Sequence, residues 1–262
     1  MHKLISFATA LWLTAMICNS RASIAQTDTT SPNTVTASWA WTTERWDASD
    51  RPFQKVRDEV WRSISHGQHP EALVGKYKAL ARTEPYHPPY DLPAQFGWAY
   101  AAYQAAVADP KFRNHGEFLP AIQALGYGPS PRSYEYARLR FLMEAMNWPD
   151  IHLKIAGERL LRRMPNDFQV KYHLTHVLAA GISPQDRDTA VVYAQQMVRA
   201  MPDKANMYSL LGETRFTRWL GNKSKADGDS AVAAYQKYLA LAPQNDSFRK
   251  QAQFLIKRIR SG

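Results

Sequence analysis

Residues Ala231–Asn245 read A-V-A-A-Y-Q-K-Y-L-A-L-A-P-Q-N, and this stretch predicts a helix that a proline closes. Its apolar residues recur at the spacing of one helical face: Ala231, Ala234, Tyr235, Tyr238 and Leu239. Pro243 follows and ends the helix, because proline lacks a backbone N–H and clashes with the preceding turn.

The same arrangement of a helix followed by a proline occurs twice more, in Ile155–Asn166 and Ala190–Asp203. The three closing prolines, Pro165, Pro202 and Pro243, lie 37 and 41 residues apart. Helical units that repeat at such intervals are typical of stacked hairpins, in which each unit buries its apolar face against its neighbours. The sequence therefore predicts an all-α fold, built as an antiparallel helix-hairpin repeat solenoid.

The repeats divide the chain into segments. We expect irregular helical-hairpin repeats over residues 51–130, more regular repeats over 131–244 and a C-terminal capping helix over 245–262. Glycines and prolines within Gly126–Pro131 predict a break between the two sets of repeats. The polar stretch Gly221–Asp229 is expected to be a loop between helices, and Gly181–Asp188 contains the extra residues of the preceding unit.

The last repeat resembles the tetratricopeptide repeat (TPR) family. An aromatic residue, a Leu-Gly pair, a small residue, a second aromatic residue and a closing proline follow in the family's order: Tyr208, Leu211, Gly212, Ala231, Tyr235 and Pro243. The units depart from the family in length, since a TPR unit has about 34 residues. The resemblance covers Pro131 to the C-terminus, is weak over Arg51–Leu125, and implies small residues where the helices of a hairpin approach closely.

The N-terminus predicts export. An apolar run of 14 residues, Leu4–Ile17, follows Lys3, and small residues near Ala25 suit cleavage, so residues 1–25 are expected to be a signal peptide of a bacterial protein. A retained membrane anchor is the alternative, although the run is shorter than the roughly 20 residues that span a bilayer. Cys18 is the only cysteine, so the exported chain would have no disulfide and no catalytic thiol.

Residues 26–50 are expected to be a disordered, tryptophan-rich segment, and the chain as a whole is basic. Trp39, Trp41 and Trp46 either fold back on an apolar face or form a platform for carbohydrate. The net charge of +10 falls to +8 when Lys3 and Arg21 leave with the signal peptide. In an exported protein this charge favours solubility or contact with anionic envelope components over nucleic acid.

No motif in the sequence indicates catalysis. It contains no phosphate-binding glycine loop, no G-x-S-x-G elbow and no H-E-x-x-H pair. His173 and His176 share a helical face and could hold a metal, but the helix provides no acidic ligand at matching spacing, so surface histidines are the favoured interpretation. Carboxylate pairs such as Asp186 and Asp188 are expected to be exposed. We therefore expect a non-catalytic protein without a cofactor or a metal.

The TPR resemblance implies that the first helix of each hairpin lines a concave wall that holds a peptide. Eight residues occupy the corresponding positions: Tyr134, Arg138, Gln169, Tyr172, His176, Asn206, Ser209 and Glu213. Phe141 and Phe216 share this wall or belong to the core. The expected function is binding of a protein or peptide partner; the alternative is a structural protein that contacts membrane or cell-wall polymer. The sequence indicates no oligomeric state.

Overall fold

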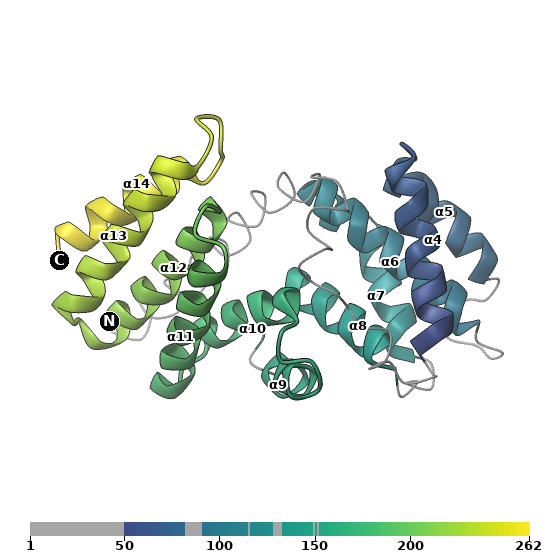
Figure 1. Cartoon of the computed structure of the whole chain (residues 1–262), viewed down its shortest axis with the longest axis horizontal. Coiled ribbons are helices and arrows are strands. Elements are labelled where there is room, and N and C mark those ends of the chain that lie inside the picture. Colours follow the sequence, from purple (N-terminus) through teal and green to yellow (C-terminus); the bar gives the residue numbers. More distant parts are fainter. Residues whose placement is uncertain (1–49, 82–90, 115, 128–132, 149, 151) are drawn as a thin grey trace. The chain divides into compact units, whose positions relative to one another are not determined.

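The computed structural model describes eleven α-helices and one short 3-10 helix (Figure 1). It describes residues 50–81, 91–114, 116–127, 133–148, 150 and 152–262, and within them there is no strand. The expected all-α class is confirmed for this part of the chain. The expected signal peptide and the tryptophans of residues 26–49 lie outside the described residues.

The described residues form two compact units, one ending at Asn147 and the other beginning at Trp148. The division therefore falls one helix after the break expected at Gly126–Pro131. The helix over Tyr134–Asn147 belongs to the first unit, because its contacts are with the helices that precede it.

The first unit is built around its third helix. Its helices are α4 (Arg51–Ser65), α5 (Pro70–Ala81), α6 (Leu92–Ala108), η3 (Pro110–Asn114), α7 (Phe118–Tyr127) and α8 (Tyr134–Asn147). Helix α6 contacts all the other elements of this unit. Its alanines and aromatic residues are apolar on every side, which is the pattern of a helix without a solvent face. Asp91 caps its start by accepting a hydrogen bond from the backbone of Ala94 at 3.1 Å.

A glycine allows α5 to approach α6 closely. A Cβ atom added at Gly97 would lie 2.5 Å from the ring of Tyr77 and 2.8 Å from Val56. The ring of Phe53 on α4 also packs 5.3 Å from the ring of Phe96, the neighbour of Gly97. Small and large side chains therefore fit together at the centre of this unit, as close-packed interiors require.

A buried polar network fixes the start of α8 against the start of α4. The hydroxyl of Ser133 caps α8 by accepting a hydrogen bond from the backbone of Tyr136 at 3.1 Å, and donates one to Asp50. Asp50 also accepts from the backbone of Glu135 at 3.2 Å, and the Glu135 carboxylate pairs with Arg57. Glu135 is thus paired with an arginine and Asp50 accepts hydrogen bonds, as burial of carboxylates demands.

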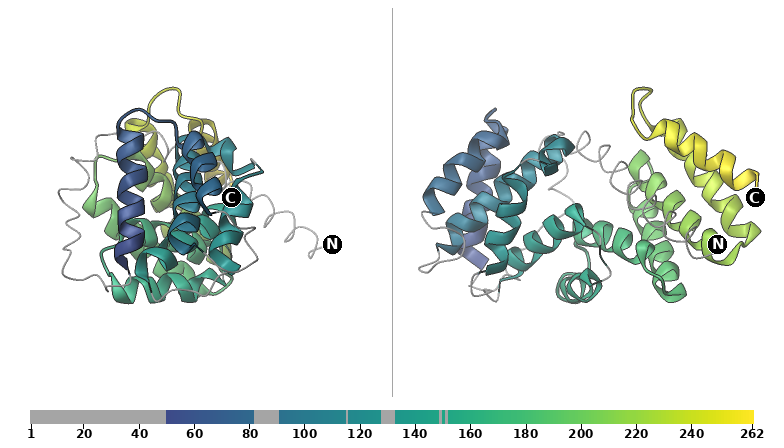
Figure 2. Two further views of the ribbon diagram at one scale, coloured as in Figure 1. Left: turned by 90° about the vertical axis from the view of Figure 1, so that its right-hand side faces the viewer. Right: turned by 180° about the vertical axis from the view of Figure 1, so that it is seen from behind.

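The second unit contains six helices. They are α9 (Leu153–Arg163), α10 (Phe168–Ala180), α11 (Pro184–Ala200), α12 (Ala205–Asn222), α13 (Lys225–Leu241) and α14 (Arg249–Arg260). Helix α9 precedes the hairpins α10–α11 and α12–α13, and the last helix, α14, follows them. Each helix contacts the next, and α10 also contacts α12 across the intervening helix. Two views of this unit show α12, α13 and α14 side by side in sequence order (Figures 1 and 2).

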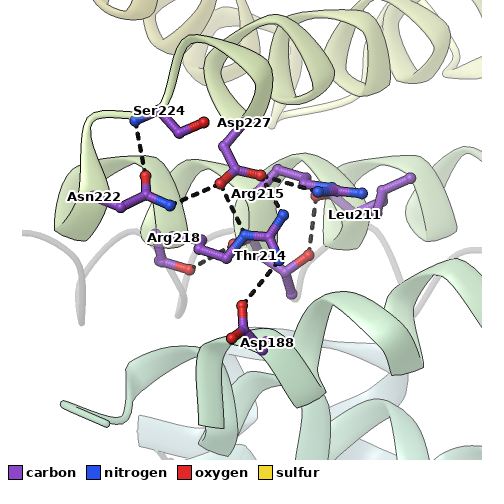
Figure 3. Close-up of polar contacts among 9 residues, drawn as sticks. Asp188, Leu211, Thr214, Arg215, Arg218, Asn222, Ser224 and Asp227 are labelled. Carbon is purple, nitrogen blue, oxygen red and sulfur yellow. Dashed lines mark hydrogen bonds and ion pairs between the residues drawn. The ribbon is translucent and has the colours of Figure 1, made fainter. Parts of the chain in front are cut away.

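The prediction of a loop over Gly221–Asp229 was wrong. Helix α12 continues to Asn222 and α13 begins at Lys225, so only two residues join them, with Lys223 in the left-handed conformation at a φ of 54°. The polar residues of this stretch form hydrogen bonds inside the protein. Asp227, only 4% exposed, accepts hydrogen bonds from Arg215, Asn222 and Arg218 (Figure 3).

This network joins three helices. The guanidinium of Arg218 on α12 pairs with Asp227 on α13 and also with Asp188 on α11, the latter at 2.9 Å (Figure 3). Burial raises the pKa of Asp227, but hydrogen bonds from Arg218, Asn222 and Arg215 outweigh it and lower the pKa to about 2. The carboxylate is therefore ionised at neutral pH.

Helix α11 begins at Pro184, so most of the polar stretch Gly181–Asp188 lies in its first turns. Asp186, expected to be exposed, is instead buried with an exposure of 7%. Its carboxylate accepts a hydrogen bond from Lys154 on α9 at 2.6 Å, and this bond raises the pKa of Lys154. A salt bridge to a lysine 32 residues earlier leaves no local signal in the sequence.

The close approach expected at Gly212 is present between α12 and α13. A Cβ atom added there would lie 2.6 Å from the ring of Tyr235, which is fully buried. The same ring lies 6.3 Å from the ring of Phe248, which precedes α14. Tyr235 thus fills the space between its own hairpin and the last helix.

Candidate functional site

Six of the eight residues expected on the wall come from two helices of the second unit. Gln169, Tyr172 and His176 lie on α10, and Asn206, Ser209 and Glu213 lie on α12, at the three- and four-residue spacings that place side chains on one helical face. These two helices contact each other although α11 separates them in sequence. The set is thus drawn from two adjacent first helices of successive hairpins.

A direct contact joins the two helices at His176. Its Nδ1 atom lies 3.5 Å from Oε2 of Glu213, and its ring packs edge-on against the ring of Tyr172 with centroids 4.8 Å apart. His176 is only 2% exposed, and the Glu213 side chain is 14% exposed. An imidazole and a carboxylate at low exposure interact more strongly than the same pair in water.

Tyr172 has a second role in packing. It is 6% exposed and belongs to an apolar cluster with four residues of α11 and α12: Ala194, Met197, Met207 and Leu210. The aromatic ring therefore holds α10 against the next hairpin and at the same time positions the imidazole of His176. Removing the ring would disturb both the core and the site, which makes Tyr172 a poor choice for testing binding alone.

Asn206 has a buried side-chain oxygen that lacks a hydrogen-bond partner among the described residues. The residue as a whole is 9% exposed. Ser209, one turn later, donates its hydroxyl to the backbone oxygen of Asn206 at 2.9 Å. An unpaired buried amide oxygen costs about 1–3 kcal/mol.

A residue that the sequence interpretation placed only in the core adjoins this set. The hydroxyl of Tyr235 on α13 is buried and has no hydrogen-bond partner among the described residues. Burial, followed by the nearby carboxylate of Glu213, raises the pKa of Tyr235 well above its usual value. The aromatic position of the TPR pattern signals packing, and nothing local in the sequence indicates that its hydroxyl would lie near a carboxylate.

The remaining candidates belong elsewhere. Tyr134 and Arg138 lie on α8 in the first unit and are 2% and 8% exposed. The positive charge of Arg138 acts on the buried hydroxyl of Tyr100. Phe141 and Phe216 are 2% and 3% exposed and are core residues, which was one of the two interpretations of these positions.

The six residues on α10 and α12, called here the α10–α12 face, are Gln169, Tyr172, His176, Asn206, Ser209 and Glu213. The chemistry that they offer is hydrogen bonding and aromatic contact. His173, expected on the surface, is 6% exposed. Within the described part of the chain, no three residues of the types His, Cys, Asp and Glu gather so that they could hold a metal ion. The helices described there also include none long and apolar enough to cross a membrane.

No protein-family model, curated protein or solved structure matches the chain. The function is therefore inferred from the six residues of the α10–α12 face: Gln169, Tyr172, His176, Asn206, Ser209 and Glu213.

Proposed function

We propose that the chain is an exported, non-catalytic TPR-like repeat scaffold that binds a peptide segment of a partner protein. The α10–α12 face is the proposed binding surface. In a repeat array the first helices of successive hairpins lie side by side, and their side chains together form one continuous surface. The tetratricopeptide resemblance of the last repeat and the helical pairing of α10 to α13 support this assignment.

The observation that carries the proposal is the contact of His176 with Tyr172 and with Glu213, on the face that also contains Asn206. Peptides present backbone N–H and C=O groups at regular intervals, and extended peptides are recognised by side chains that offer both donors and acceptors. Asn206 and Glu213 provide acceptors, while His176 provides a ring that donates or accepts. Tyr172 adds an aromatic surface of the kind that is enriched at binding sites.

Site-specific photocrosslinking tests the proposal. A photoreactive amino acid at Gln169, which is half-buried on the α10–α12 face, should crosslink a discrete protein in an envelope extract. The same group at Glu158 on α9, whose side chain is 38% exposed and lies outside this face, should not. Glu213→Gln, which removes the carboxylate charge but keeps the shape, should reduce the crosslink from Gln169 severalfold.

The matched control for Glu213→Gln is Glu158→Gln, which removes one negative charge from the same unit. Circular dichroism of both variants establishes that they remain folded. Equal crosslinking from Gln169 and Glu158, or a crosslink from Gln169 that Glu213→Gln leaves unchanged, would contradict the proposal.

A further inference from the structure

Helix α9, the first helix of the second unit, has one side in the core and one in solvent. It packs on α10 (Figure 1). Its buried residues share one side of the helix: Gly157, Leu160 and Leu161. The exposed side forms a stripe at spacings of four and three residues, which place side chains on one helical face: Ile155, Arg159 and Arg162.

Large apolar side chains are exposed around the start of α9. Ile155 is 60% exposed, and Trp148, in the segment that leads into α9, is 63% exposed. Ile182, in the turn between α10 and α11, is 91% exposed. A hydrogen bond of 2.6 Å from Lys154 to Asp186 holds the start of α11 against the start of α9. Ile182 precedes Asp186 by only four residues, so this turn lies near the start of α9.

The charge of α9 is predominantly positive. Residues Leu153–Arg163 include four basic residues and one acidic residue, Glu158, whose carboxylate lies 3.9 Å from Nζ of Lys154. Arg159 and Arg162 are exposed and form no ion pair with the described residues. Two positive charges therefore remain at the surface without a carboxylate in contact with them. The α9 patch is defined as Trp148, Ile155, Arg159, Arg162 and Ile182.

The mixture of apolar and basic side chains in the α9 patch favours a membrane surface as its partner. Tryptophan and aliphatic side chains enter the headgroup boundary of a bilayer, where basic side chains attract anionic lipids. Ile182 protrudes from a turn, and a protein partner would need a pocket that matches it. A fluid headgroup layer accepts side chains that protrude at any spacing. A soluble polyanion would contact the arginines but would bury none of the apolar surface.

We propose that the α9 patch docks on an anionic bilayer surface. Arg159 and Arg162 contact lipid phosphates, and the side chains of Trp148, Ile155 and Ile182 enter the headgroup layer. The patch contains no residue of the α10–α12 face, so docking on a bilayer does not depend on peptide binding.

An environment-sensitive fluorescent amino acid at Ile155 of the full chain tests this proposal. Its emission should shift to shorter wavelength with vesicles of phosphatidylcholine and phosphatidylglycerol, and added salt should weaken this effect. Pure phosphatidylcholine vesicles should cause a much smaller shift. The same amino acid at Val192 on α11, which is 47% exposed and lies outside the α9 patch, should show no shift. Both chains carry the same residues 1–49, so the comparison reports contact of α9 itself.

Three variants that carry the probe at Ile155 separate the α9 patch from the overall charge. Each basic side chain near an anionic surface contributes about fivefold in affinity, so Arg159→Gln/Arg162→Gln should raise the vesicle concentration at half-maximal shift about 25-fold. Lys250→Gln/Lys257→Gln removes two exposed basic residues from α14 in the same unit and should cause a much smaller change. Ile182→Gln keeps every charge and should weaken binding while the salt dependence remains. Thermal unfolding confirms that the variants are folded.

Four results would overturn the proposal. The first is an equal loss in the α9 and α14 double variants, which would indicate a diffuse charge effect. The second is unchanged binding of Ile182→Gln. The third is an equal spectral shift, or none, at Ile155 and Val192. The fourth is binding of a soluble polyanion such as polyphosphate without binding of phosphatidylglycerol vesicles.

Discussion

Replacing Asp227 with asparagine should destabilise the second unit in a way that depends on pH. The pKa of this carboxyl falls from 3.8 to about 2 on folding. A decrease of that size corresponds to roughly 2 kcal/mol of stability at neutral pH, since one pKa unit is about 1.4 kcal/mol. Because the folded pKa is the lower one, this contribution is complete above the unfolded pKa and is lost as the pH falls from about 4 to about 2.

The assay is urea unfolding followed by circular dichroism, with hydrogen exchange to follow α12 and α13 separately. The wild type should exceed Asp227→Asn by roughly 2 kcal/mol at neutral pH and by about half of that near pH 3. Asp229→Asn is the matched control, because Asp229 lies on the same helix and forms only an exposed pair with Lys225. Its stability should stay close to that of the wild type.

Two results would refute this reasoning. One is an Asp227→Asn variant that is as stable as Asp229→Asn at neutral pH. The other is a stability difference from the wild type that does not shrink as the medium is acidified.

Two more predictions concern packing and a buried hydroxyl. Gly97→Ala should destabilise the first unit by about 1–3 kcal/mol, because its Cβ would overlap the ring of Tyr77. Gly75→Ala on α5, where an added Cβ meets nothing within 4 Å, should instead stabilise it by up to about 1 kcal/mol, and urea unfolding compares the two. Tyr238→Phe should lose about 2 kcal/mol, because it removes the 2.6 Å hydrogen bond to Asp246. Burial and then that bond raise the pKa of Tyr238 above 10.0, so its contribution should be complete below pH 10 and disappear at higher pH; a constant difference would contradict this.

Much of the helical architecture could be predicted from local pattern. Helix α10 begins at Phe168, directly after Asp167, which accepts a hydrogen bond from the backbone of Val170 and caps the start, as its residue type favours. The expected close approach at Gly212 is likewise present, since only a residue without a side chain allows the ring of Tyr235 to lie there.

The sequence predicted which helices carry the residues of the candidate site, but it did not predict how deeply those residues are buried. The resemblance to the TPR family placed Tyr172, His176 and Glu213 on first helices, and in the structure His176 contacts both Tyr172 and Glu213. Their burial could not be predicted from sequence, because it depends on which residues of other helices lie against them. Their role in binding a partner remains a prediction.

The loop expected at Gly221–Asp229 shows where local reasoning fails. Asp, Asn and Ser residues favour turns when their side chains bond to nearby backbone groups. Here Asp227 bonds instead to Arg215, Arg218 and Asn222, and the stretch extends two helices. The preference of the isolated segment was overridden by partners up to 12 residues away.

The amino-acid sequence determines that the described chain is helical, where most helices lie and that its last helix has one apolar and one basic face. These properties follow from 3.6-residue periodicity, capping residues and prolines, all of which act within a few turns. Tertiary structure alone decides which polar residues are buried and with which partners they pair. Asp186 with Lys154 and His176 with Glu213 are examples, because such pairs join residues that are distant in sequence and become neighbours only when the helices pack.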